Sequence, residues 1–124
     1  MTGKTVLYVE DNEFNRKIVR DLLATTSYRL IEASDGEMGV ATALRETPDL
    51  ILIDIQMPKL SGLEATRMLR ADSKTAQIPI IVITSFALSG DDKKAMAAGA
   101  SAYMAKPYSP RDLLAQIRKL LPET

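Results

Sequence analysis

The chain contains no cysteine and no histidine. Without cysteine it cannot form disulfides, Cys-ligated metal sites or iron–sulfur clusters. Without histidine it lacks the usual zinc ligand and the usual acid–base group for neutral pH, so a hydrolase triad built on Cys or His is excluded. The absence of cysteine fits a cytoplasmic protein, and a cytoplasmic location is what we expect.

Net charge and long apolar segments are also missing. Sixteen Lys and Arg residues balance sixteen Asp and Glu residues, so no overall positive charge attracts nucleic acid or anionic lipid. Apolar runs such as Ile80–Ile83 are too short to span a bilayer, and the N-terminus has no signal-peptide hydrophobic region. We therefore expect neither a nucleic-acid partner nor a membrane partner.

The length of the chain predicts one domain. Its 124 residues are enough to bury one sizeable core, and too few for such a domain plus an output domain. We therefore expect a single domain over residues 1–124, with no output domain.

Five short aliphatic or β-branched runs alternate with helical patterns along the chain. Two of the runs, 50–53 and 80–83, are apolar throughout, as is typical of buried parallel strands. In the last helical pattern, Leu113 and Ile117 lie on one face and Arg118 lies off it. The predicted strands are Thr5–Val9, Arg29–Glu32, Leu50–Ile53, Ile80–Ile83 and Ala102–Ala105.

Most of the predicted helices have a recognisable start. A serine followed three residues later by an acidic residue matches the capping box. Pro110 is expected at the first position of the last helix, and Gly99 is expected to end the fourth helix in a left-handed conformation. The four capping pairs are Ser34 with Glu37, Ser61 with Glu64, Ser89 with Asp92, and Ser109 with Asp112.

Five repeats of strand and helix predict an α/β fold with a doubly wound parallel sheet and helices on both faces. In such sheets the functional site lies beyond the carboxyl ends of the strands. The residues that follow the predicted strands are therefore the first candidates for function.

Three carboxylates, a hydroxyl and an ammonium group stand at those positions. Clustered carboxylates favour a hard divalent cation such as Mg²⁺. A carboxylate can also act as a nucleophile toward phosphorus, and Mg²⁺, a lysine and a hydroxyl would stabilise the phosphoryl group that it accepts. The residues are Glu10, Asp11, Asp54, Thr84 and Lys106.

Each residue taken alone has an ordinary explanation. Asp11 would cap a helix, Asp54 would form a turn, and Lys106 would be a solvated lysine. Thr84 would be a strand residue and Tyr103 would pack in the core. The functional interpretation rests on four strand ends carrying suitable groups together.

Four stretches, in this order, resemble the response-regulator receiver family: VLYVEDNEFNRKIVRDLL, PDLILIDIQMPKLSGLEATRMLR, IPIIVITSFALSGD and GASAYMAKPYSPRDLLAQI. The resemblance covers essentially the whole chain and is strongest to single-domain members, although receivers of hybrid histidine kinases carry similar strings. It implies a flavodoxin-like fold with five strands in the order 2-1-3-4-5.

The resemblance implies a role for each residue of the metal site. Asp54 accepts the phosphoryl group, and Asp11 binds Mg²⁺ directly. Glu10 helps through water, and the backbone carbonyl of Gln56 supplies another oxygen. Many members of the family carry Asp at the first acidic position, so Glu10 is a departure that affects the water-mediated contacts to the metal.

The resemblance also implies a switch. Thr84 donates its hydroxyl to the phosphoryl group, Lys106 pairs with it from the opposite side, and Pro107 follows a cis peptide bond. Tyr103 is the aromatic residue that turns inward as Thr84 moves. The positions at which the family tunes phosphate lifetime are Ile55, Gln56, Ser85 and Phe86.

The implied function is two-component signalling by a phospho-accepting switch, which is not an enzyme but assists its own phosphorylation and dephosphorylation. The expected donor is a histidine kinase or a histidine phosphotransfer protein, which docks on the first helix, Asn12–Thr25. A downstream protein would read the face formed by Asp91–Ala98, Ala102–Ala105 and Tyr108–Leu120. We expect a monomer or a weak homodimer.

Four alternatives remain open. A hydrolase of the haloacid dehalogenase type would need a second acid two residues after Asp54, where this chain has Gln56. A flavodoxin-type flavin carrier would need a phosphate-binding loop where Glu10 and Asp11 would repel phosphate. The others are a phosphate-independent scaffold, or pseudo-receiver, and a receiver that is part of a longer protein such as a hybrid kinase.

Overall fold

The computed structural model describes residues 3–84 and 90–123. In these ranges strands and helices alternate along the chain. The elements are β1 (Thr5–Val9), α1 (Glu13–Leu23), β2 (Arg29–Ala33), α2 (Gly36–Glu46), β3 (Leu50–Asp54), α3 (Gly62–Ala71), β4 (Ile80–Thr84), α4 (Asp91–Ala98), β5 (Ala102–Ala105) and α5 (Pro110–Leu120).

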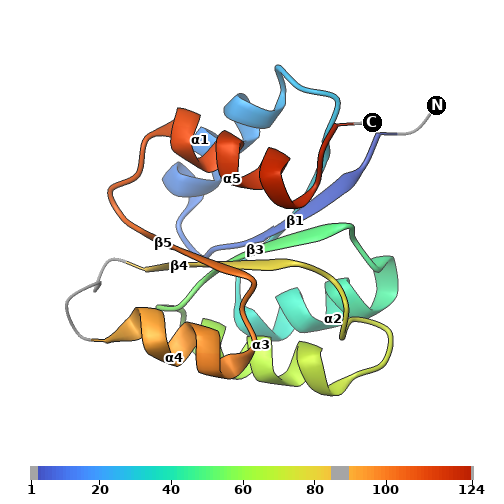
Figure 1. The fold of residues 1–124 in the computed structure, drawn as a ribbon, viewed down its shortest axis with the longest axis vertical. Helices are drawn as coiled ribbons and strands as arrows, with labels where there is room; N and C mark the ends of the chain where they lie inside the picture. Colours follow the sequence, from blue (N-terminus) through green and yellow to red (C-terminus); the bar gives the residue numbers. More distant parts are fainter. Residues whose placement is uncertain (1–2, 85–89, 124) are drawn as a thin grey trace.

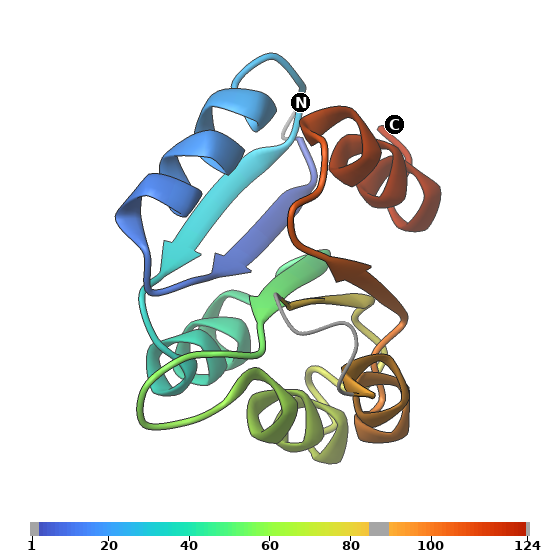
Figure 2. The same ribbon diagram turned by 90° about the vertical axis from the view of Figure 1, so that its left-hand side faces the viewer.

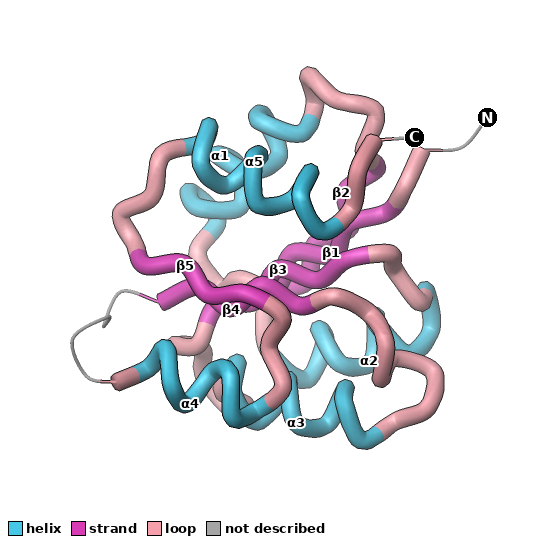
Figure 3. Tube along the Cα trace, viewed as in Figure 1, coloured by secondary structure: helices cyan, strands magenta, loops and turns pink. Residues whose placement is uncertain are grey.

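The strands form one parallel sheet in the order β2-β1-β3-β4-β5. Helices α1 and α5 cover one face, and α2, α3 and α4 cover the other (Figure 1). The view along the layers shows the same two-sided arrangement (Figure 2), and Figure 3 shows the strands enclosed between the helices. The predicted fold class and strand order are therefore confirmed. Within the described ranges, no helix combines the length and the apolar character needed to cross a membrane.

Each face of the sheet has its own hydrophobic core. All residues of β3 and β4 are buried, as their continuous apolar sequences predict. Leu7 and Val9 of β1 pack under α2, α3 and α4, whereas Val6 and Tyr8 pack under α1 and α5. Successive side chains of a strand point to opposite faces, which explains this division.

Three strands extend one residue beyond their predicted ends, to Ala33, Asp54 and Thr84. Asp54 pairs with Ile83 in the ladder between β3 and β4, and Thr84 pairs with Ala105 in the next ladder. The two polar residues are therefore held by the sheet itself and not by mobile turns, at the same edge where β1 and β5 end.

Two of the predicted helix caps are confirmed. Ser61 and Glu64 form a reciprocal capping box at the start of α3. The Ser109 side chain accepts a hydrogen bond from the backbone of Asp112, with Pro110 as the first residue of α5. Gly99 ends α4 with a φ of 108°, the left-handed conformation that favours glycine.

The other two caps were predicted wrongly. Asp35, and not Ser34, precedes α2, because the Asp35 carboxylate is in place to accept a hydrogen bond from the Met38 backbone at 2.8 Å. Gly90, which has no side chain, precedes α4, so Ser89 is not its N-cap. Ser89 itself lies outside the described residues.

The first helix is shorter than predicted and begins at Glu13. Asn12 is its N-cap, and its side chain accepts a hydrogen bond from the Asn15 backbone at 2.9 Å. Asp11 is therefore not the cap, and its carboxylate is available for another role at the edge of the sheet.

The C-terminal segment closes the opposite end of the sheet, near the start of β1 and β2. Lys4 donates to the backbone oxygen of Pro122 at 2.7 Å, and the buried Tyr28 hydroxyl donates to that of Leu121. Glu123 accepts hydrogen bonds from the backbone and hydroxyl of Ser27. These contacts fix the amino end of the sheet, far from the carboxyl ends that carry the candidate site.

Candidate functional site

Three carboxylates meet at the carboxyl ends of β1 and β3. One ligand oxygen from each of Glu10, Asp11 and Asp54 lies within 4.8 Å of the others. Glu10 is 1% exposed and Asp54 is 3% exposed, whereas Asp11 faces solvent. Carboxylate oxygens grouped in this way suit a hard divalent cation that keeps part of its water shell on the open side.

One ammonium group stands between the two buried carboxylates. The Lys106 Nζ atom lies 2.7 Å from Asp54 Oδ2 and 2.9 Å from Glu10 Oε1. Lys106 directly follows β5, and the peptide bond between it and Pro107 is cis, as expected. The sheet order places β5 two strands from β3, so the long lysine side chain spans β4 to reach the acids.

The single lysine leaves the carboxylates partly uncompensated. Burial and the neighbouring Glu10 charge, opposed by Lys106, together raise the pKa of Asp54 to about 6. Burial also acts to raise the pKa of Glu10, but hydrogen bonds with Lys106 and Asp54 hold that pKa below its ordinary value. Burial and the Glu10 charge raise the pKa of Asp11. The cluster therefore gains electrostatically from an added cation.

The loop after β3 holds Asp54 from the other side. The Gln56 backbone donates to Asp54 Oδ1 at 3.0 Å, and the Gly62 backbone donates to the Ile55 carbonyl at 3.0 Å. A Cβ atom on Gly62 would lie only 2.2 Å from the Asp54 carbonyl oxygen. Glycine is thus required at position 62 for the backbone of α3 to approach the carboxylate-bearing residue.

Thr84 lies fully buried at the end of β4 and contacts the side chain of Gln56. The Gln56 Nε2 atom donates to Thr84 Oγ1 at 3.0 Å. The sequence predicts a backbone carbonyl ligand at Gln56 and a position that tunes phosphate lifetime, but not the contact with Thr84. Gln56 lies two residues after Asp54, close enough in the chain for its side chain to reach the same edge of the sheet. This spacing is the feature of the sequence that could have indicated the contact.

Tyr103 lies on β5, half-buried against the core under α2, α3 and α4. It pairs with Val82 in the ladder, while Ala105 pairs with Thr84. Tyr103 and Thr84 therefore project from adjacent strands toward the same face, two positions apart. Ser85 and Phe86, which follow Thr84, lie outside the described residues.

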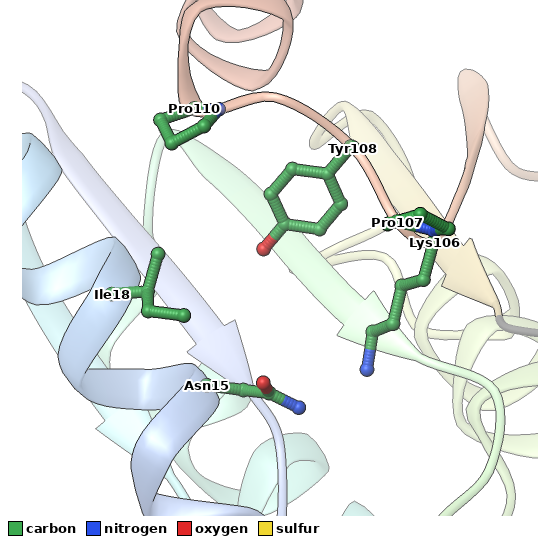
Figure 4. Close-up of a pocket in the computed structure, with 6 residues that line it drawn as sticks. All are labelled: Asn15, Ile18, Lys106, Pro107, Tyr108 and Pro110. Carbon is green, nitrogen blue, oxygen red and sulfur yellow. The ribbon is translucent and has the colours of Figure 1, made fainter.

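A cavity of about 550 Å³ adjoins the site between α1 and the segment that joins β5 to α5. Figure 4 shows Lys106 and the Tyr108 ring on one side, with Asn15 and Ile18 of α1 opposite them. Phe14 on the same helix is 70% exposed. The predicted docking helix therefore presents apolar side chains beside the acidic cluster.

Two side chains besides Lys106 donate to the Glu10 carboxylate and were missed from the sequence. The Tyr8 hydroxyl donates to Glu10 Oε1 at 3.1 Å, and Asn15 Nδ2 donates to the same oxygen at 3.3 Å. Tyr8 lies two positions before Glu10, and residues two apart in extended chain point to the same side. This spacing is the one feature of the sequence that indicates the contact.

Comparison with known proteins agrees with this geometry. A family model described as the response regulator receiver domain matches residues 6–118. The polar-differentiation response regulator DivK of Brucella anthropi is 41% identical over 118 residues, which cover 95% of this chain and 96% of DivK.

Solved structures give the same result. The receiver domain of the sensor histidine kinase PA1611 from Pseudomonas aeruginosa PAO1, which has a magnesium ion coordinated in its active-site cleft, superposes with a TM-score of 0.89 and 36% identity, covering 95% of this chain and 97% of that one. The chemotaxis response regulator CheY4 of Vibrio cholerae has a TM-score of 0.89 and 29% identity, with coverage of 95% and 98%.

Proposed function

This chain belongs to the response regulator receiver family, and from that we propose that it is a two-component switch that accepts a phosphoryl group on Asp54. The observation that carries the proposal is the Lys106 ammonium, held between Asp54 and Glu10 within a cluster of three carboxylates. Most lysines keep their ammonium group in water, so a lysine held among buried carboxylates indicates a specific role.

The acceptor step follows from the contacts of Asp54. One carboxylate oxygen would form the new O–P bond while the bond from phosphorus to the donor nitrogen breaks, giving an aspartyl phosphate. The donor would be a histidine kinase or a histidine phosphotransfer protein. Lys106, which already lies 2.7 Å from Asp54, would remain beside the new negative charge.

Glu10, Asp11, Asp54 and the backbone carbonyl of Gln56 would hold Mg²⁺. The donor set fits this ion, because all four groups offer hard oxygen and Asp11 leaves one side open to water. When bound, Mg²⁺ would neutralise charge on the phosphoryl oxygens.

Thr84 and Tyr103 would convert the charge into a change of shape. The Thr84 hydroxyl, which accepts a hydrogen bond from Gln56, would donate its proton to a phosphoryl oxygen once that group is present. Movement of Thr84 toward the phosphoryl group would leave room on the face that it shares with Tyr103. The surface of α4, β5 and α5 would then differ between the two states and be read by a downstream protein.

The expected partners dock on different surfaces. The phosphoryl donor would contact α1, where Phe14 and Ile18 are exposed next to the acidic cluster. A cytoplasmic location and a monomer or weak homodimer belong to the same proposal.

The proposal is tested by phosphorylation with a small donor. The protein is incubated with Mg²⁺ and acetyl phosphate, and its intact mass is measured beside Asp54→Asn and Asp21→Asn. Asp21 is an exposed carboxylate on α1, paired with Lys17, and its variant is the matched control. We expect one added phosphoryl group in the wild type and in Asp21→Asn, and none in Asp54→Asn.

Two results would contradict the proposal. Phosphoryl gain in Asp54→Asn would mean that another carboxylate is the acceptor. A folded wild-type protein that gains no phosphoryl group from acetyl phosphate or from a panel of histidine kinases would favour the phosphate-independent scaffold.

A further inference from the structure

Tyr8 is a buried tyrosine that the proposed phosphoryl transfer does not use. It is 0% exposed in the middle of the sheet, under α1 and α5. Its hydroxyl lies 3.1 Å from Glu10 Oε1. An ionised carboxylate only accepts hydrogen bonds, so the proton of this bond comes from the tyrosine.

The bond depends on the length of the Glu10 side chain. Tyr8 and Glu10 are two positions apart and project from the same face of the chain. An aspartate at position 10 would be shorter by one carbon–carbon bond, which draws the carboxylate back toward the backbone by as much as about 1.5 Å. A hydrogen bond of 3.1 Å does not survive a retreat of that size. Tyr8 and Glu10 are thus matched to each other.

Three other groups donate to the Glu10 carboxylate, and each is shared with another acceptor or lies nearer the surface. Lys106 divides its ammonium between Glu10 and Asp54. The Asn12 backbone donates to Oε2, and Asn15 donates to Oε1, each at 3.3 Å and near solvent. The bond from Tyr8 is the fully buried one of these four, and the Tyr8 hydroxyl has a single proton to donate, so it fixes the direction of the carboxylate on the side away from solvent.

We infer that Tyr8 is a positioning residue for the metal site, because its hydroxyl orients the Glu10 carboxylate. The Tyr8–Glu10 pair thereby supplies the metal-site carboxylate that a shorter aspartate supplies in many receivers. The inference rests on the proposed function, because it requires Glu10 to assist Mg²⁺ binding. It explains why the longer acid at position 10 is compatible with a metal site.

The test is a double-mutant cycle in Mg²⁺ affinity, measured by calorimetry on the unphosphorylated protein. The four proteins are the wild type, Tyr8→Phe, Glu10→Asp and the double variant. Tyr28→Phe is the matched control, since it removes the hydroxyl of another buried tyrosine that bonds to Leu121 at the other end of the sheet. Thermal unfolding of every variant is recorded alongside.

We expect Tyr8→Phe to weaken Mg²⁺ binding by about three- to tenfold, the effect of losing one hydrogen bond. In the Glu10→Asp background, where the bond cannot form, the same substitution should change affinity by less than about twofold. Tyr28→Phe should lower thermal stability without changing Mg²⁺ affinity. A merely structural role for Tyr8 would weaken binding equally in both backgrounds.

The outcomes separate this inference from the proposed function. Equal Mg²⁺ affinity of the wild type and Tyr8→Phe would overturn the positioning role alone. The same follows if Tyr8→Phe weakens Mg²⁺ binding equally with Glu and with Asp at position 10. Wild-type protein that binds no Mg²⁺ would overturn the proposed metal site, and the inference with it. Should Tyr8→Phe fail to fold, the NMR signals of the Tyr8 ring in the wild type should shift on Mg²⁺ binding while those of Tyr28 do not, and an unmoved Tyr8 ring would overturn the positioning role.

Discussion

The two ends of the sheet differ in how their charged side chains are compensated. At the carboxyl end, Glu10 and Asp54 are buried around the single ammonium of Lys106, and burial raises the pKa of Asp54 to about 6. At the amino end, charged side chains are surrounded by the hydrogen-bond partners that they need. The comparison shows that the carboxyl end keeps neighbouring buried carboxylates whose repulsion an added cation would relieve, whereas the amino end surrounds its charges with hydrogen-bond partners.

Arg70 is the clearest example at the amino end. Its guanidinium donates to four backbone oxygens and one hydroxyl, which join the end of α3 to the segments that lead into β4 and β5. Burial lowers the pKa of Arg70, and no carboxylate in the described ranges pairs with it. The acceptors are those of Gly99, Thr75, Ala76, Ile78 and Ser101.

The largest expected effect comes from Arg70→Met. Methionine keeps much of the apolar stem but leaves several backbone oxygens without their donor, so we expect a loss of about 2–4 kcal/mol in the free energy of unfolding. Urea unfolding measures it. Phosphorylation of the folded variant by acetyl phosphate should be unchanged, because Arg70 lies at the opposite end of the sheet from Asp54.

Arg67→Met is the control, since Arg67 is exposed on the same helix. A loss of stability as large in Arg67→Met would show that Arg70 has no special role. A loss of phosphorylation in folded Arg70→Met would show that the two ends of the sheet are not independent.

Asp54→Asn tests the carboxyl end through pH. The pKa of Asp54 is raised in the folded protein, so its contribution to stability is fully present below about 4 and is lost as the pH rises through about 6. Asparagine carries no charge to bury. Asp54→Asn should therefore gain stability relative to the wild type as pH rises from 4 to 7, by about 1–3 kcal/mol without divalent cations.

Urea unfolding at pH 4 and pH 7 measures this difference, with the exposed Asp21→Asn as the control. An equal difference between wild type and Asp54→Asn at the two pH values would mean that the buried carboxylate is not under electrostatic strain. Added Mg²⁺ should reduce the advantage of Asp54→Asn, because the wild type then binds the cation that offsets its repulsion.

The sequence predicted the parts of this comparison that follow from local patterns. Continuous apolar runs located β3 and β4, and the residues after the strands brought Asp54 and Lys106 to one edge. The cis bond before Pro107 was predicted from family resemblance. These features depend on strand periodicity and on the rule that parallel strands end together.

The features that the sequence did not predict depend on competition between neighbouring cap residues or on contacts between residues that are brought together only by folding. Asp35 and Ser34 are both good cap residues, and it is the Asp35 side chain that accepts the hydrogen bond from the Met38 backbone. The contact of Gln56 with Thr84 and that of Tyr8 with Glu10 depend on side-chain conformations that no spacing rule gives. Nothing in the sequence distinguishes Arg70 from other helical arginines, because its acceptor, the carbonyl of Gly99 after α4, is close only in the folded chain.

Glu123→Gln gives the smallest effect and the opposite dependence on pH. Hydrogen bonds from the Ser27 backbone and hydroxyl, and one from Arg118, lower the pKa of Glu123 to about 2. A lowered pKa gives stability that is present above the ordinary value of about 4.5 and is lost as the pH falls toward 2. Glutamine lacks this contribution, so the variant should be less stable than the wild type at pH 7.

The disadvantage of Glu123→Gln should shrink as the pH falls from 5 to 2, in the range below that in which Asp54→Asn gains its advantage. Thermal unfolding across pH 2–7 at low and high salt measures both curves, and salt should weaken the Glu123 effect because its ion pair with Arg118 is at the surface. Parallel curves for Glu123→Gln and wild type would show that the C-terminal contacts do not involve an ionised carboxylate. Opposite slopes for the two variants would place the electrostatic strain of this protein at the carboxyl end of its sheet, where the proposed chemistry requires it.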